Sequence, residues 1–222
     1  MKLLLKAIFK CIMGALCLGA VLFLPAGTLN YQGAWLLMTV LFIPMAFLGV
    51  FLYFKAPELL KKRLNSKEEN REQRSVIALS ALLFVAVFVL SGLDFRFGWS
   101  QLPRWVVIAA AVLFLIGYGL YAEVMRENAY LSRTVEVQQG QKVIDTGLYG
   151  LVRHPMYFAT ILLFLAMPLV LGSLYAFFLM LIGYPPILVF RICDEERTLT
   201  DGLPGYRAYT DKVRYRLFPP IW

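Results

Sequence analysis

The sequence predicts an all-α protein: a polytopic membrane helix bundle with four spans, then a C-terminal helical hairpin, and no Rossmann domain. Two observations lead to this fold class. Of the 222 residues, 60% are apolar and only 16% are charged, with a mean hydropathy of +0.68, and the apolar residues gather in long runs. A soluble domain is about half apolar and a quarter charged, so the composition excludes an ordinary cytosolic globular protein. It also excludes a disordered chain, which needs low hydrophobicity and high charge.

Five apolar runs supply the expected membrane helices. About 20 residues are needed to cross roughly 30 Å of hydrocarbon. Four runs are interpreted as single spans: 7–24, 34–54, 75–90 and 105–125, of which the third is the shortest and is expected to extend through 91–93. The fifth run, 157–190, would be about 51 Å long as one helix, which exceeds the bilayer core. Because Pro168 and the pair of Gly172 and Ser173 lie near its middle, we expect a hairpin of two helices.

The basic residues support this topology. With the N-terminus in the cytoplasm and the last run folded as a hairpin, 20 of the 22 Lys and Arg residues lie on the cytoplasmic side, as the positive-inside rule requires. A single crossing by the last run would instead place six basic residues outside. The sequence therefore predicts cytoplasmic N- and C-termini. The small size and short loops are typical of a protein of the bacterial cytoplasmic membrane.

The most unusual chemistry begins after residue 125. The only histidine of the chain, His154, stands between Arg153 and Pro155 at the start of the hairpin. Arg153 and His154 can donate hydrogen bonds to an anionic group, and Tyr149 and Tyr157 can stack or hydrogen-bond. The alternative is that these side chains only anchor the helix end at the membrane interface, as basic and aromatic residues often do.

A second polar cluster follows the hairpin. Arg191 and Glu195 are four residues apart, so they share one face if the helix continues, and Glu196 comes next. Ionisable groups at a membrane helix end point to function, although a simple salt bridge is the plain alternative. Closure of the hairpin brings the cationic and the anionic cluster to the same cytoplasmic mouth. Together they could hold a zwitterionic ligand, such as one with an amino-acid end.

Other classes of site find no support in the sequence. The net charge of +8 suits nucleic acid, but the apolar excess argues against such a partner. The three cysteines have no CxxC spacing and only one histidine accompanies them, so neither a disulfide framework nor a metal site is expected. P-loop, HExxH and GxSxG motifs are absent from the sequence.

Three elements follow one another in the C-terminal part of the chain: Gly147-Leu148-Tyr149-x-x-x-Arg153-His154-Pro155-Met156-Tyr157, then Arg191-x-x-x-Glu195-Glu196, then Gly205-Tyr206-x-x-Tyr209-x-x-x-Val213. In this order they resemble the isoprenylcysteine carboxyl methyltransferase family and the related membrane phospholipid methyltransferases. The first element is specific, and the other two are weaker. The resemblance runs from Thr134 to the C-terminus, about 40% of the chain.

The resemblance implies an integral membrane enzyme that uses S-adenosylmethionine without a Rossmann domain. It implies cytoplasmic entry of the cofactor and a lipophilic acceptor from the bilayer: an isoprenylcysteine-type carboxylate, a lipid amine or a thiol. Arg191 would face the acceptor, and Glu196 is the second expected catalytic residue. The expected cofactor-binding residues are Gln141, Val143, Ile144, Gly147, Tyr149, His154, Pro155, Met156, Tyr157 and Glu195.

Hydropathy and the resemblance together suggest two regions. Residues 1–125 would form the N-terminal transmembrane helices, with a charged connector at 55–74 that we expect to be helical and to lie at the cytoplasmic surface. Residues 126–222 would form the cofactor-binding catalytic region with the hairpin and a cytoplasmic tail. The acceptor, the oligomeric state, a gating role for the connector and the essential acid among 194–196 stay open.

Two other functions are compatible with the sequence. Membrane sterol-type reductases are similar in their C-terminal helices but bind a nicotinamide cofactor, and they carry additional helices that this chain lacks. A small transporter or assembly protein is the non-catalytic alternative. A transporter would be expected to carry ionisable residues near the middle of the bilayer, and the first three predicted spans have none.

Overall fold

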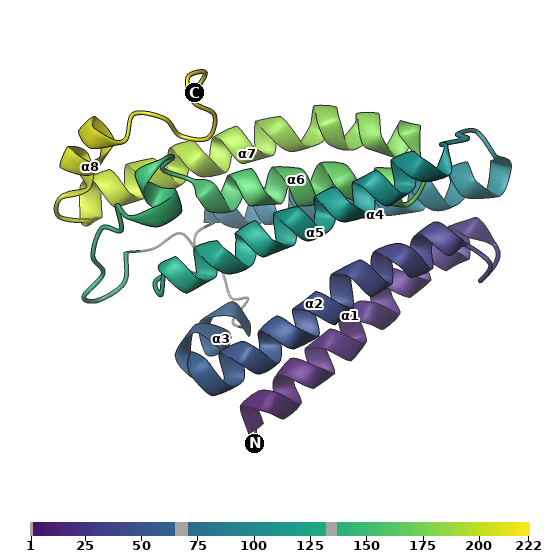
Figure 1. The fold of residues 1–222 in the computed structure, drawn as a ribbon, viewed down its shortest axis with the longest axis horizontal. Helices are drawn as coiled ribbons and strands as arrows, with labels where there is room; N and C mark the ends of the chain where they lie inside the picture. Colours follow the sequence, from purple (N-terminus) through teal and green to yellow (C-terminus); the bar gives the residue numbers. More distant parts are fainter. Residues whose placement is uncertain (1, 65–70, 132–136) are drawn as a thin grey trace.

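The computed structural model describes residues 2–64, 71–131 and 137–222, and every regular element in these ranges is helical (Figure 1). The six long helices pack side by side, and the three short elements lie at their ends. The elements are α1 (Lys2–Ala26), α2 (Gln32–Lys55), α3 (Pro57–Leu64), α4 (Arg71–Phe97), α5 (Arg104–Glu127), η1 (Gly147–Gly150), α6 (Pro155–Val170), α7 (Leu174–Gly202) and α8 (Tyr206–Lys212).

The protein is an integral membrane protein with an all-helical fold, as the sequence predicts. Five helices (α1, α2, α4, α5 and α7) are long and apolar enough to cross a bilayer. The sixth apolar helix, α6, has only 16 residues, or about 24 Å. It forms the short arm of a hairpin with α7, which confirms the predicted division of the fifth apolar run.

The turn of this hairpin lies where the sequence predicts it. Pro168 stays inside the last turn of α6, and Gly172 follows with a positive φ of 79°, a conformation that glycine adopts without steric cost. Ser173 then caps α7, because its side chain accepts a hydrogen bond from the amide of Ala176 at 3.1 Å. The break is therefore set by local residues, which explains why the sequence reveals it.

Two helices are longer than their apolar runs. The third predicted span continues to Phe97 in α4, and α7 continues through Gly202, which makes it about 44 Å long. The last three turns of α7 carry its acidic residues beyond the apolar part of the helix. Of the predicted connector, residues 57–64 are helical as α3, whereas 65–70 lie outside the described residues.

A buried carboxylate ties one end of the bundle together. Asp94 of α4 is only 1% exposed, and it accepts hydrogen bonds from the amide of Ser100 at 2.6 Å and from its hydroxyl at 2.7 Å. The hydroxyl of Ser173, at the hairpin turn, also donates to Asp94. The α4–α5 loop and the α6–α7 turn are thus fastened to each other.

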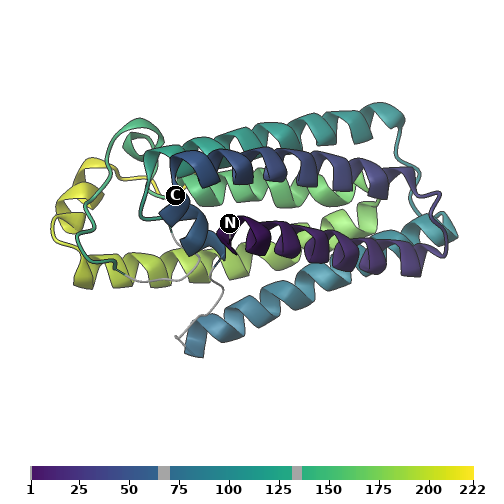
Figure 2. The same ribbon diagram turned by 90° about the horizontal axis from the view of Figure 1, so that it is seen from below.

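The opposite end gathers the polar segments. Figures 1 and 2 show α3, the loop between α5 and α6, α8 and both chain termini toward this end, and the short helix connections at the other. In the bundle, α6 packs along α5, and α4 packs against α1 and α7. Every segment that the sequence singles out for its chemistry therefore lies at one end of the molecule.

Candidate active site

The C-terminal tail fastens the segment before α6 by backbone pairing. The amide of Arg153 donates to the carbonyl of Tyr215 and the amide of His154 to the carbonyl of Arg216, both at 2.9 Å. Pro155 follows as the first residue of α6, where its missing N–H costs no helical hydrogen bond. The histidine is thereby fixed between a helix start and a returning tail.

Glu196 forms the centre of a buried ion-pair cluster. Its Oε1 accepts from Nε of Arg153 at 2.7 Å and from Nε2 of His154 at 3.2 Å, and its Oε2 accepts from Nε of Arg216 at 2.7 Å. Because an ionised carboxylate only accepts, His154 must donate through Nε2, which leaves Nδ1 as an acceptor in the neutral ring. One further nitrogen of Arg153 donates to the carbonyls of Val213 and Arg214.

Gly147 and Tyr149 shape the loop that precedes α6. Gly147 has a positive φ of 54°, and the Glu127 carboxylate occupies the space that a side chain at this position would fill. From there the carboxylate accepts a hydrogen bond from the amide of Leu148 at 3.0 Å. Tyr149 is buried, receives a hydrogen bond from Asn128 at 3.0 Å, and accepts one at its carbonyl from the Tyr209 hydroxyl at 2.8 Å. Burial raises the pKa of Tyr149, so its phenol stays protonated.

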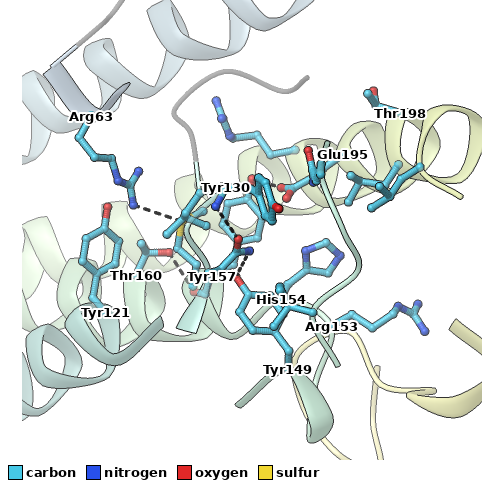
Figure 3. A pocket seen from close by; sticks show the side chains of 18 of the residues that line it. Arg63, Tyr121, Tyr130, Tyr149, Arg153, His154, Tyr157, Thr160, Glu195 and Thr198 are labelled. Atoms are coloured by element: carbon cyan, nitrogen blue, oxygen red, sulfur yellow. Dashed lines mark hydrogen bonds between the residues drawn. The ribbon is translucent and has the colours of Figure 1, made fainter. Parts of the chain in front are cut away.

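A cavity of about 500 Å³ opens beside these segments, and Figure 3 shows part of its lining. Nine of the twelve predicted site residues line it. They are Gln141, Val143, Ile144, Tyr149, His154, Met156, Tyr157, Arg191 and Glu195. Residues from the two polar clusters of the sequence therefore share one cavity.

The other three predicted site residues do not line this cavity. Gly147 admits the Glu127 carboxylate, and Pro155 starts α6. Both carboxylate oxygens of Glu196 are engaged by Arg153, His154 and Arg216. Glu196 therefore has the position of a buried counter-ion outside the cavity lining, and its expected catalytic role stays a prediction.

The cavity has a polar part and an apolar part. The polar part is bordered by the loop after α5, by the last turns of α7 and by α8, with Gln141, His154, Glu195, Thr198 and Tyr206. The apolar part lies between α4, α6 and α7. Its lining residues are Ile77, Ala81, Phe84, Phe164 and Ile187.

Hydrogen-bonded side chains mark the junction of the two parts. The Tyr157 hydroxyl donates to Oε2 of Glu195 at 2.7 Å, and the hydroxyls of Thr160 and Tyr184 lie 2.8 Å apart. Arg191 lies near the hydroxyls of both tyrosines. An acidic and a basic group thus meet at the junction, which suits a ligand that carries both charges.

Two cavity residues that the sequence did not single out carry unsatisfied polar atoms. In the described ranges, Nε of Arg63 and the hydroxyl of Tyr206 are the buried side-chain nitrogen and oxygen atoms without a hydrogen-bond partner, and both residues line this cavity. Buried polar groups are nearly always paired, so such atoms indicate a ligand or water. Tyr206 belongs to the third resemblance element, whereas Arg63 is one of seven basic residues in the connector, and no pattern distinguishes it.

The comparison with protein families agrees with this geometry. Residues 105–203, from α5 through the end of α7, match the model of the phospholipid methyltransferase family. The matched stretch contains most of the cavity residues in the α5–α6 loop, α6 and α7. This region of the chain is similar to the phospholipid methyltransferase family, whose members are membrane methyltransferases that use S-adenosylmethionine.

Proposed function

We propose that this protein transfers the methyl group of S-adenosylmethionine to the headgroup of a membrane lipid inside the cavity described above. The observation that carries the proposal is the continuity of the cavity, which joins a polar part at the loop-bearing end of the bundle to an apolar part between α4, α6 and α7. A water-soluble cofactor and a lipid could each reach the junction from its own side.

The polar part has the groups to hold the cofactor. The cavity as a whole, at about 500 Å³, lies in the range of small-molecule sites, about 300–1,000 Å³. The backbone of 141–144 would line the adenosine, with Tyr149, His154, Met156 and Tyr157 completing the pocket. Glu195 would hold the ammonium of the cofactor. The hydroxyl of Tyr206 supports this fit, because Tyr206 lines the same cavity and its hydroxyl has no hydrogen-bond partner among the described residues.

Methyl transfer depends on the alignment of donor and acceptor more than on acid–base groups. Bound S-adenosylmethionine would supply an activated methyl group, which passes to an acceptor in line with the carbon–sulfur bond, with S-adenosylhomocysteine as the leaving group. The side chains at the junction would orient the acceptor and exclude water from it. A carboxylate or thiolate acceptor needs no general base, whereas the ammonium of a lipid amine must first lose a proton. Arg191 would hold a carboxylate acceptor through two parallel hydrogen bonds.

Membrane depth favours a lipid acceptor. The hydrocarbon core is about 30 Å thick, and α6 at about 24 Å is shorter. His154, just before α6, would therefore lie near the boundary between headgroups and hydrocarbon, where the reacting part of a lipid resides. With both termini in the cytoplasm, as the charge distribution predicts, the polar part opens toward the compartment that contains the cofactor.

Replacing Glu195 with glutamine tests the cofactor assignment. The change keeps the hydrogen bond from Tyr157 but removes the charge that would pair with the cofactor ammonium. We expect the affinity for S-adenosylhomocysteine to fall by about 1.5–3 kcal/mol, or roughly 10- to 150-fold. Calorimetric titration of the detergent-purified protein measures this directly.

The matched control is Asp194→Asn, which removes the same charge from the neighbouring position of α7, outside the cavity lining. We expect it to bind S-adenosylhomocysteine as the native protein does. Equal affinity in both variants would remove Glu195 from the cofactor site. No binding by the folded native protein would refute the proposed use of the cavity.

Replacing Tyr206 with phenylalanine separates ligand binding from stability. The hydroxyl has no hydrogen-bond partner in the described part of the chain although Tyr206 is 4% exposed, so its loss should leave the melting temperature of the free protein unchanged or higher. Burial raises the pKa of Tyr206, so the phenol is available as a donor. We expect S-adenosylhomocysteine to bind about two- to tenfold more weakly.

Tyr209→Phe provides the contrast, because the Tyr209 hydroxyl donates to the carbonyl of Tyr149 and its loss should lower the melting temperature. The Tyr206 assignment fails if Tyr206→Phe binds S-adenosylhomocysteine with native affinity.

A further inference from the structure

Arg63 reaches the cavity from α3, the helix of the connector between α2 and α4. Its guanidinium carbon lies 5.3 Å from the centre of the Tyr121 ring of α5, and one terminal nitrogen lies 4.0 Å from the sulfur of Met156 of α6. Its Nε is buried and has no hydrogen-bond partner among the residues that the structure describes. The guanidinium is therefore held over the cavity by an aromatic face and a thioether, neither of which is a strong acceptor.

This arrangement differs from that of the paired arginines. Arg126, Arg153 and Arg216 each hold a carboxylate at 2.8 Å or closer. Among the side chains that the structure describes, no carboxylate lies within 4.0 Å of the Arg63 guanidinium. A buried donor left without an acceptor is costly. The guanidinium is thus shaped and charged to receive an oxyanion from a ligand.

The position of Arg63 is fixed by the packing of α3. Leu59 and Leu60, one turn earlier, are 6% exposed and pack with Val124 and Met125 of α5. Residues three and four apart share a face of a helix, so this packing directs Arg63 toward the bundle as well. Pre-organisation of this kind lowers the entropy lost when a ligand is bound.

Arg63 and the proposed cofactor acid lie at opposite sides of the cavity. In Figure 3, Arg63 and Tyr121 stand on one side, Glu195 and Thr198 on the other, and Tyr157 between them. The group that Arg63 receives is therefore separate from the ammonium held by Glu195. Arginine binds phosphate oxygens through two parallel hydrogen bonds, which suits a phosphodiester at headgroup depth.

We infer that Arg63 binds the phosphate of a phospholipid acceptor and so selects phosphate-bearing lipids for methyl transfer. This inference rests on the proposed function, since it names the class of acceptor for the same cavity. Arg63 acts on the part of the headgroup that does not react, whereas Arg191 faces the reacting part.

The test compares Arg63→Ala and Arg63→Lys with Lys61→Ala in the full-length protein in detergent. Lys61 lies on the same helix, and its side chain is 72% exposed beside Glu58, so Lys61→Ala removes the same charge away from the cavity. Each variant is titrated with dioctanoyl phosphatidic acid, with dioctanoylglycerol as the phosphate-free probe, with inorganic phosphate and with S-adenosylhomocysteine.

We expect Arg63→Ala to bind dioctanoyl phosphatidic acid at least tenfold more weakly and Arg63→Lys to lose less. Lys61→Ala should be unchanged, and dioctanoylglycerol should bind all four proteins alike. The affinity for S-adenosylhomocysteine should stay within twofold of native. Competition by inorganic phosphate at equal concentration would instead identify a site for the free ion and overturn the lipid assignment.

Two further results would overturn the inference. Unchanged phosphatidic acid affinity in Arg63→Ala would remove Arg63 from the acceptor site, and an equal loss of S-adenosylhomocysteine affinity would make Arg63 a partner of the cofactor carboxylate. These titrations need no methyl transfer. A native protein that binds phosphatidic acid through Arg63 but fails to bind S-adenosylhomocysteine would therefore refute the proposed function while supporting the lipid site.

Discussion

Glu196→Gln is expected to destabilise the protein by about 3 kcal/mol or more. Glu196 is 9% exposed, and its carboxylate holds Arg153, His154 and Arg216 together. Glutamine keeps the size of the side chain but removes the charge, so two guanidinium groups face each other without a counter-ion. Removing one partner from a buried ion pair costs about 3–5 kcal/mol, because it leaves charge buried and uncompensated.

The measurement is thermal unfolding in detergent, followed by circular dichroism, with Glu123→Gln as the control. Glu123 pairs with Arg126 on the exposed surface of α5, where an ion pair adds little to stability, so this variant should melt like the native protein. If Glu196→Gln also melts like the native protein but loses methyl transfer, Glu196 would return to the catalytic role first expected from the sequence.

Much of the fold is encoded in local sequence. Helices that cross the membrane require long apolar runs, which are evident in the sequence. The break at Gly172 and Ser173 depends only on residues at the turn itself, so it can be predicted as well. The extension of α7 to Gly202 is harder to predict from the sequence. Its last turns are polar, so no apolar run marks them, and packing in the folded protein holds them helical. The burial of Asp94 likewise depends on Ser100 and Ser173, which come from two separate loops.

The site divides in the same way. The segments 141–157 and 191–196 could be placed at one mouth because the hairpin closes between them. The role of the tail could not be predicted. Its backbone carbonyls pair with the amides of Arg153 and His154, and every residue has a carbonyl, so the sequence does not show which ones pair. Without that pairing, Glu196 looks like a free acid beside Glu195, whereas the folded chain gives it three cationic or hydrogen-bonding partners.

Arg191→Ala is expected to abolish most methyl transfer while sparing cofactor binding. Arg191 lines the cavity near the hydroxyls of Tyr157 and Tyr184, at the junction of the polar and apolar parts. Loss of a charge-assisted contact to the acceptor costs about 1.5–3 kcal/mol, so kcat/KM should fall by roughly 10- to 150-fold. The measurement is the rate of transfer from labelled S-adenosylmethionine to phospholipid vesicles, alongside titration with S-adenosylhomocysteine.

The control is Arg197→Ala, because Arg197 lies on α7 but is exposed and outside the cavity lining. Native rates in this variant would show that the loss in Arg191→Ala comes from the position of the charge and not from the net charge of the helix. Arg191→Lys should recover part of the rate, since lysine keeps the charge but lacks the planar fork. If Arg191→Ala instead loses S-adenosylhomocysteine affinity to the same degree as transfer, the guanidinium binds the cofactor, and the acceptor must be oriented by the remaining groups at the junction.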